Sequence, residues 1–180
     1  QQMLETAESI YGQDQWGRYD LLILPPSFPF GGMENPRLSF ITPSVLAGDQ
    51  SLVSLIAHEL AHSWSGNLVT NLTWRDIWLN EGITSYLDAR LMEVLFGEER
   101  ANEERVLSYL DLQRGLGKVS PEMQALAPTK NIDVPSASQG SLHYQKGQLF
   151  MQHLEHIFGR EEFDPFLAGY FNRFAFQSIS

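Results

Sequence analysis

The chain has 180 residues, of which 43% are hydrophobic and 19% are charged. This composition is typical of one moderate globular domain and excludes collagen-like and disordered chains. The formal net charge of -10 repels phosphate backbones, so we expect no nucleic-acid partner. There is no cysteine, so any metal must be held by nitrogen and oxygen atoms. No apolar run approaches the roughly 18 residues of a membrane span, and we expect no membrane partner.

The first part of the sequence combines one helix with a small sheet. We predict a helix over residues 1–12, a buried strand over 19–24, where an apolar run stops at two prolines, and a second strand over 37–41. Between the strands, residues 27–36 contain prolines and paired glycines, which exclude an interior strand and indicate an exposed edge or loop. The backbone of a ligand can approach closely at such a place.

Helical periodicity dominates the rest of the chain. Apolar residues at three- and four-residue steps predict a helix over 51–65, stopped at Gly66, and a second helix over 75–96. Residues 117–140 are predicted to form a long irregular connection. Further helices are expected at residues 99–115, 142–158 and 161–174. The expected fold is α+β and mostly helical, one domain over residues 1–180 with a small sheet at its N-terminal end.

The strongest chemical signal lies within the helix predicted over 51–65, where His58 and His62 are four residues apart. Histidines at this spacing lie one turn apart on a single helix face, so both imidazoles can reach one zinc ion. Glu59 lies beside them and can poise a water molecule. The alternative is a helix with two exposed histidines and a surface glutamate.

A third ligand is available downstream, because Glu81 lies in the next predicted helix. Catalytic zinc takes three protein ligands and keeps one position open, and two histidines with one carboxylate are a standard set. An antiparallel helix pair would bring Glu81 to the two imidazoles. Taken alone, Glu81 would be interpreted as a solvated helix residue.

Four short segments carry a resemblance to a known family: Gly31–Asn35, His58–His62, Asn80–Gly82 and Tyr144–Gly147. In this order they resemble the gluzincin aminopeptidases of the aminopeptidase N type, and most of all the branch that contains leukotriene A(4) hydrolase and aminopeptidase B. The resemblance covers nearly the whole chain and implies a thermolysin-like zinc metallopeptidase catalytic domain. Because family members are longer, it also implies an N-terminal β domain and a C-terminal helical domain that are missing here.

The resemblance implies a role for each motif residue. One zinc ion per chain would be bound by His58, His62 and Glu81, with Glu59 as general base and Tyr144 as transition-state stabiliser. The segment expected to bind substrate comprises Gly31, Gly32, Met33, Glu34 and Asn35. These roles also make chemical sense, because zinc lowers the pKa of its water and a phenolic O–H can donate to an oxyanion.

Glu34 would decide the kind of peptidase. A fixed carboxylate near the metal pairs with the ammonium of a chain terminus, so only the first peptide bond reaches the zinc. The expected substrates are therefore peptides with a free N-terminus. Gly31 and Gly32 would let the substrate lie beside the edge as an added strand, although a simple tight turn accounts for the glycine pair equally well. Asn35 is expected either to orient Glu34 or to cap the turn.

Two alternative functions stay open. A thermolysin-like endopeptidase uses the same chemistry, and Glu34 disfavours it. A non-catalytic zinc-binding scaffold for peptides belongs to another class, and Glu59 argues against it because a structural metal site needs no base.

Outside the motifs, Asn80 and Asp88 are candidates to support the ligands, with a solvated aspartate as the favoured interpretation of Asp88. Three histidines lack partners at ligand spacing and are expected at the surface or in packing: His143, His153 and His156. Three tryptophans are expected to wall the site through core packing, with contact to substrate by one of them as the alternative: Trp64, Trp74 and Trp78.

One departure from the family pattern bears on the reaction. In leukotriene A(4) hydrolase the epoxide hydrolase reaction depends on an aspartate and a second tyrosine shortly before the matched catalytic tyrosine. Counted back from Tyr144 without gaps, those places hold Ser136 and Gln139. We therefore expect peptide hydrolysis and no lipid-epoxide hydrolysis.

Overall fold

The computed structural model describes residues 1–128 and 142–180. Ser136 and Gln139, and with them the expectation about epoxide chemistry, lie outside the described residues. The part of the predicted irregular connection that is described contains a 3-10 helix at Pro121–Gln124.

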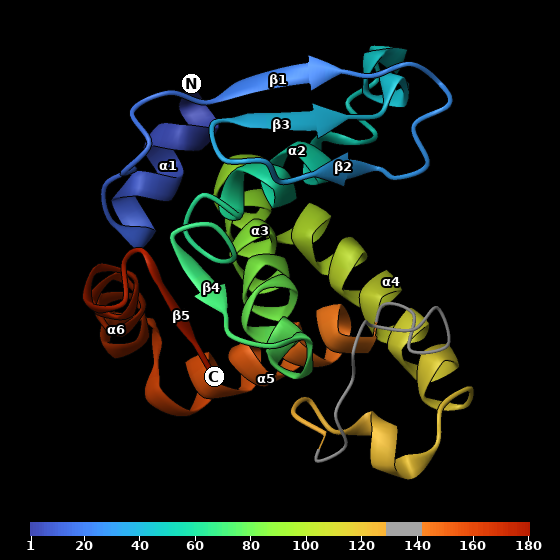
Figure 1. Ribbon diagram of the computed structural model, residues 1–180, viewed down its shortest axis with the longest axis vertical. Coiled ribbons are helices and arrows are strands. Elements are labelled where there is room, and N and C mark those ends of the chain that lie inside the picture. The colour runs from blue at the N-terminus through green and yellow to red at the C-terminus, as the bar shows by residue number, and fades with distance from the viewer. Residues whose placement is uncertain (129–141) are drawn as a thin grey trace.

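A small sheet near the N-terminus has three strands in the order β1-β3-β2 (Figure 1). The central strand β3 (Leu38–Ile41) is parallel to β1 (Asp20–Ile23) and antiparallel to β2 (Gly32–Met33). Both strands predicted in this region are therefore confirmed. The expectation that the first one is buried is wrong, because β1 is an outer strand with a neighbour on one side only, and Leu21 and Leu22 are 39% and 43% exposed.

The segment predicted to be an edge or loop, residues 27–36, contains the edge strand β2. Gly32 pairs with Ile41 and Met33 with Phe40 of β3. Strand β2 also lies next to helix α2 (Val53–Ala61), which carries the histidine motif. The edge therefore borders the candidate site.

Helix α2 is shorter than the predicted 51–65 helix. After Ala61 the chain continues in tight turns, in which the N–H groups of Ser63 and Trp64 donate to carbonyl oxygens three residues back. These turns lead to Gly66, whose φ of 102° lies in the left-handed region and suits glycine. The motif histidines are thus at the C-terminal end of the helix.

The single helix predicted over 75–96 is divided into two. A 3-10 helix, Trp74–Leu79, leads to Asn80, and α3 (Glu81–Phe96) begins only at the next residue. Apolar periodicity does not distinguish the two helix types, because both repeat at three to four residues. Glu81 is therefore the first residue of a helix instead of an interior residue.

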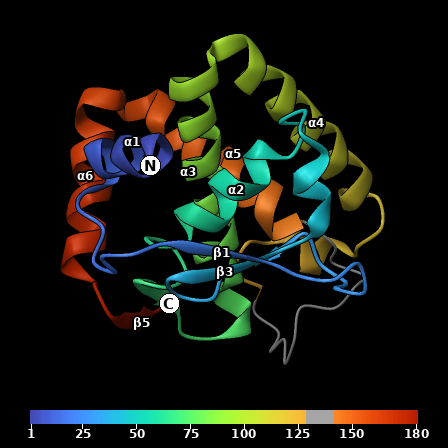
Figure 2. The same ribbon diagram turned by 90° about the horizontal axis from the view of Figure 1, so that it is seen from above.

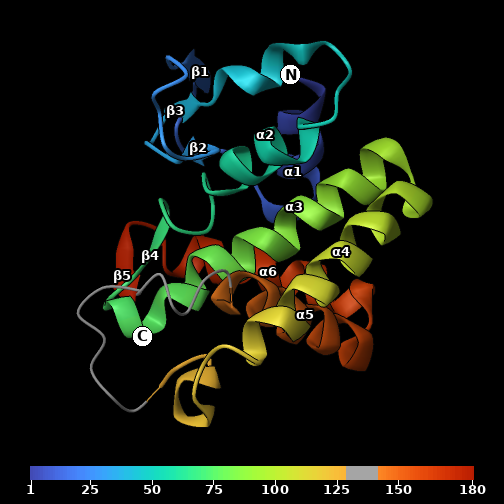
Figure 3. The ribbon, with the colours of Figure 1, turned by 90° about the vertical axis from the view of Figure 1, so that its right-hand side faces the viewer.

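Four other helices confirm the sequence prediction within two residues at each end: α1 (Gln2–Tyr11), α4 (Glu98–Leu116), α5 (Leu142–Phe158) and α6 (Arg160–Arg173). Helix α3 is central and packs against α2, α4 and α5, whereas α1 packs on α6 (Figure 1). The sheet lies over one side of this helical layer, as the views turned by 90° show (Figures 2 and 3).

A second sheet was not expected from the sequence. Strand β4 (Val69–Asn71) pairs in parallel with β5 (Gln177–Ile179), so the C-terminal end of the chain lies against the segment that follows the histidine motif. Val69 is buried, and the strands are only three residues long. So short a pair depends on tertiary contact and leaves little periodic signal.

The hydrophobic core gathers around α3, which is buried on nearly all sides. Its apolar core residues are Ile83, Tyr86, Leu87, Leu91 and Met92. A helix that buries residues all round belongs in the centre of a domain. Among the described residues, no helix has the length and apolarity needed to cross a membrane.

Candidate metal centre

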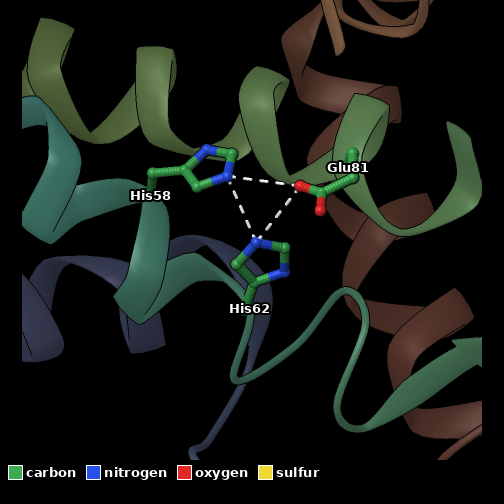
Figure 4. A group of neighbouring side chains, drawn as sticks. All are labelled: His58, His62 and Glu81. Atoms are coloured by element: carbon green, nitrogen blue, oxygen red, sulfur yellow. Dashed lines mark hydrogen bonds and ion pairs between the residues drawn. The ribbon is translucent and has the colours of Figure 1, made fainter. Parts of the chain in front are cut away.

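Three side chains that are far apart in the sequence converge at the end of α2. The Nε2 atoms of His58 and His62 lie 3.2 Å apart, and each lies 3.4 Å from Oε2 of Glu81 (Figure 4). The two imidazoles come from the last turn and the C-cap of α2, and Glu81 comes from the start of the neighbouring α3. The structure thus brings together the three residues that the motif spacing singled out.

The opposite nitrogen of each imidazole is held by the protein. His58 Nδ1 lies 2.7 Å from Oδ2 of Asp88, and His62 Nδ1 lies 3.0 Å from the carbonyl oxygen of Ser65. A carbonyl oxygen only accepts, so Nδ1 of His62 is the donor and its Nε2 lone pair faces Glu81. The favoured interpretation of Asp88 as a solvated residue is wrong, because its position two turns after Glu81 brings it directly against His58.

The converging atoms suit a bound cation. Oε2 of Glu81 is buried and has no hydrogen-bond partner among the described residues. It faces two imidazole nitrogens, so electron pairs point at a common centre. A tetrahedral zinc ion with bonds of about 2.0–2.1 Å places its ligand atoms about 3.3–3.4 Å apart, which matches the observed distances. The nitrogen and oxygen donor set also fits zinc.

Burial and charge shift the pKa values of these groups. Burial alone would raise the pKa of Glu81, but the imidazoles of His58 and His62 outweigh it and hold the pKa well below its usual range. Burial alone would lower the pKa of His58, but Asp88 and Glu81 raise it well above its usual value. The site therefore favours positive charge at its centre.

Glu59 lies beside this centre and is 4% exposed. Burial raises the pKa of its carboxyl group to about 7, with smaller contributions from neighbouring charges. A Cβ atom added at Gly32 would lie 2.0 Å from Oε1 of Glu59, so only glycine leaves room for the carboxylate at this point of β2. The glycine that was expected to contact substrate thus also makes space for Glu59.

Glu34 belongs to the same cluster of side chains. One of its carboxylate oxygens lies within 4.8 Å of ligand atoms of Glu59 and His62. Glu34 and Glu81 also line a common cavity of about 560 Å³ between β2, β4 and the 3-10 helix. The amide of Asn67, which the sequence did not point to, donates to the backbone carbonyl of Glu34 at 2.7 Å and holds the segment in place.

The rest of the Gly31–Asn35 segment has mixed roles. The N–H of Asn35 donates to the carbonyl oxygen of Met33, and its carbonyl oxygen accepts from Leu38, so the backbone of Asn35 makes the turn that follows β2. The side-chain Nδ2 of Asn35 is buried and has no hydrogen-bond partner among the described residues, so these backbone bonds do not distinguish between the two interpretations of Asn35. The carbonyl oxygen of Gly31 accepts a hydrogen bond from the backbone N–H of Thr42.

Tyr144 reaches the site from α5. Its ring stacks on that of His58 with centroids 5.9 Å apart, and burial, followed by the charge of Glu81, raises the pKa of its hydroxyl. This approach requires glycine at two positions. A Cβ at Gly82 would lie 2.7 Å from Cα of Gly147, and a Cβ at Gly147 would lie 2.6 Å from Cα of Gly82. Helices α3 and α5 can touch only because both side chains are missing.

The remaining predicted residues surround the centre or lie apart from it. Trp64 is buried core, and its indole N–H donates to a backbone carbonyl. Trp74 is 48% exposed and lines the cavity beside Glu34, so core packing is wrong for this residue, and the alternative of substrate contact stays a prediction. Trp78 packs edge-on against Phe150. His143 packs against Tyr144, and the other two histidines of α5 are exposed, as predicted.

Comparison with known proteins agrees with this geometry. The model of the peptidase family M1 domain matches residues 1–180. The chain belongs to peptidase family M1. It is 47% identical to leukotriene A-4 hydrolase of Xenopus laevis, matching 100% of this chain and 30% of that protein, and 43% identical to aminopeptidase B of Rattus norvegicus, matching 99% and 28%.

Solved structures of M1 relatives share the fold. Yeast LTA4 hydrolase in complex with bestatin superposes with a TM-score of 0.92 at 42% identity, over 99% of this chain and 29% of that chain. A mutant M1 zinc metallopeptidase from Deinococcus radiodurans, bound to a Tyr-Ser-Ala substrate, superposes with a TM-score of 0.77 at 25% identity, over 99% and 37%. The chain thus spans about a third of these relatives, and membership of this M1 family implies zinc. The resemblance stated from the motifs is confirmed.

Proposed function

We propose that this M1 domain is the catalytic domain of a zinc-dependent aminopeptidase that hydrolyses the N-terminal bond of peptides. One zinc ion per chain is bound by His58, His62 and Glu81. The observation that carries the proposal is the position of Glu34, whose carboxylate lies within 4.8 Å of ligand atoms of Glu59 and His62. Peptides with a free N-terminus are the proposed partners, and domains on either side of this one would complete the cleft.

Glu34 explains why the first peptide bond is cleaved. Its carboxylate pairs with the ammonium group of the substrate, and it shares a cavity with Glu81, so the bond beside that ammonium group is held at the metal site. The edge strand β2 offers backbone hydrogen-bonding groups to an extended substrate. A thermolysin-like endopeptidase would gain nothing from a carboxylate at this position.

Glu59 and Tyr144 provide the proton chemistry. When bound, zinc polarises the scissile carbonyl and lowers the pKa of water to about 7. Glu59 accepts the proton of the attacking water and passes it to the departing amine. The hydroxyl of Tyr144 donates to the oxyanion that forms at the scissile carbonyl. These roles require a base beside the metal, which a scaffold that only binds peptides does not need.

The test uses the full-length protein that contains this domain and a panel of aminoacyl fluorogenic substrates. Glu59→Gln should retain zinc, measured as metal per chain, and lose at least about 100-fold in kcat, as expected for removal of a general base. Glu99→Gln on the exposed first turn of α4 is the matched control and should behave as wild type. Peptide binding without cleavage by the wild-type protein would favour the scaffold and contradict this proposal.

A second comparison separates aminopeptidase from endopeptidase. Acetylation of the substrate's N-terminus removes the charge that Glu34 would recognise, so cleavage should cease. Glu34→Gln should lower kcat/KM for free peptides by about 30-fold, corresponding to about 2 kcal/mol for a lost charge-assisted pair. Cleavage of acetylated peptides at the same rate would instead indicate an endopeptidase.

A further inference from the structure

Ser65 contacts His62 and also the segment that leads to Glu81, so it touches the histidine side and the carboxylate side of the metal centre. Its carbonyl oxygen accepts from Nδ1 of His62 at 3.0 Å. Its hydroxyl donates to two carbonyl oxygens, that of Leu79 at 2.8 Å and that of Asn80 at 3.1 Å. Those two residues directly precede Glu81. A single side chain and its own carbonyl therefore link the second imidazole to the segment that delivers the carboxylate.

These contacts lie away from solvent. Ser65 and His62 are each 1% exposed, and Thr84 is fully buried. The hydroxyl of Thr84, in the first turn of α3, donates to the same carbonyl oxygen of Ser65 at 3.1 Å and lies 3.2 Å from Nδ1 of His62. Because water cannot replace these bonds, losing one leaves a buried polar group unsatisfied.

Gly66, the residue after Ser65, lets the histidine side and the carboxylate side of the centre lie close together. A Cβ atom added at Gly66 would lie 2.4 Å from Oδ1 of Asn80 and 2.9 Å from Nδ1 of His62. The loop thus passes between the imidazole and the residue before Glu81 with no spare volume. Small displacements of this loop must move one side of the centre relative to the other.

The two imidazoles are linked to α3 in different ways. His58 is linked by a carboxylate, since Asp88 lies on α3 itself. His62 is linked by a neutral carbonyl on the loop, and Ser65 supplies the connection from that loop to the start of α3. We propose that Ser65 is a positioning residue that holds His62 and Glu81 at metal-binding distance. This role rests on the proposed zinc site.

The experiment measures metal binding by the full-length protein. Ser65→Ala should raise the zinc Kd, measured by competition with a chelator, about 10- to 100-fold, as is typical when groups that orient ligands are removed. It should also change the visible absorption spectrum of the cobalt-substituted protein. Ser65→Thr retains the hydroxyl but adds a buried methyl group, so both readouts should lie closer to wild type than those of Ser65→Ala. Ser63→Ala is the control, because Ser63 is buried in the same turn and its carbonyl accepts the indole N–H of Trp16.

The readouts separate positioning from general stabilisation. Wild-type Kd and spectrum in Ser65→Ala would overturn the inference, even with a lower thermal midpoint. If Ser65→Ala does not fold, Thr84→Val removes the second donor to the same carbonyl at nearly equal volume and should raise the Kd several-fold; an unchanged Kd there would also overturn it. A wild-type protein that binds no zinc would overturn the proposed function as a whole, whereas equal affinities in wild type and variants would overturn only the role of Ser65.

Discussion

Helix α3 contacts buried or half-buried carboxylates at two places, and the two groups of carboxylates are neutralised differently. Toward the C-terminal end, Arg90 is 4% exposed and makes two hydrogen bonds to Asp164 of α6, at 2.9 and 3.0 Å. It also donates to the hydroxyl of Tyr86, which donates to Glu155 of α5 at 2.6 Å. At the N-terminal end, Glu81 faces two imidazoles, and within residues 1–128 and 142–180 no ion pair joins it to an arginine or lysine.

The source of the compensating charge indicates a different role for each end of α3. A buried carboxylate needs a compensating positive charge. Near Arg90 the protein supplies that charge itself, and the result is a link between three helices. Near Glu81 the described residues supply electron pairs, so the compensating charge must come from a bound ion or a proton. The first end stabilises the fold, and the second offers a binding site.

Removing the charge at the N-terminal end should abolish tight metal binding. We expect Glu81→Gln to weaken zinc affinity by at least about 1000-fold, about 4 kcal/mol, since a site worth about 10–16 kcal/mol is shared among few ligands. Chelator competition measures the change. Glu98→Gln is the control, because Glu98 is the first residue of α4, as Glu81 is of α3, but is exposed whereas Glu81 is buried. Retained affinity in Glu81→Gln would break the comparison.

Removing the charge at the other end should affect folding and leave the metal site unchanged. Arg90→Met leaves Asp164 and Glu155 without their guanidinium, and we expect a loss of about 3 kcal/mol in the free energy of unfolding. Urea denaturation measures this loss, and zinc affinity should stay at the wild-type value. Arg114→Met removes an exposed pair with Asp111 and should change stability by less than about 0.5 kcal/mol. A large loss of zinc affinity in Arg90→Met would show that the two ends are not independent.

The close contact of α3 with α5 can be tested at its glycines. In Gly82→Ala the new Cβ would lie 2.7 Å from Cα of Gly147, so α5 must move and carry Tyr144 with it. We expect about 2 kcal/mol of destabilisation and a lower kcat with little change in zinc content. Gly169→Ala in α6 is the control, because its Cβ meets nothing within 4 Å, and it should stabilise slightly. An unaltered kcat in Gly82→Ala would contradict this role for the helix contact.

A smaller effect is expected where Glu93 of α3 forms ion pairs with Arg105 of α4 and Arg160 of α6, because the strength of these pairs depends on pH. Arg160 and Arg105 lower the pKa of Glu93 from 4.5 to about 2, against a smaller opposing effect of burial. The pairing therefore stabilises the fold fully above pH 4.5 and loses its contribution as the pH falls toward 2. Glu93→Gln should cost about 1 kcal/mol at pH 7, and the difference from wild type should shrink at pH 3. Unfolding free energies at both pH values measure it, and a constant difference would contradict the prediction.

Local patterns predicted most helices and the identity of the converging residues. The spacing of His58 and His62 expresses helix geometry directly, and the edge at Gly32 follows from the glycine and proline content of its segment. Asp88 shows the limit of such reasoning. Its spacing from Glu81 indicated a shared helix face, but whether that face meets solvent or an imidazole depends on how α2 packs on α3.

The division of the predicted 75–96 helix has a similar cause. The break at Asn80 coincides with the bonds that Ser65 donates to the carbonyl oxygens of Leu79 and Asn80, and neither partner is a sequence neighbour of the other. The parallel pairing of β4 with β5 joins segments more than a hundred residues apart. Contacts of this kind leave no periodic signal in either segment.

By itself, the sequence indicated that His58, His62 and Glu81 are able to bind one metal ion, because side-chain chemistry and helical spacing are local properties. The family resemblance added the proposed roles of Glu34, Glu59 and Tyr144. Only the tertiary structure decided that these groups meet: α2 and α3 pack so that Glu81 lies 3.4 Å from both imidazoles, and paired glycines let α5 bring Tyr144 beside them. Those distances arise from packing between segments that are remote in the chain, which no local pattern encodes.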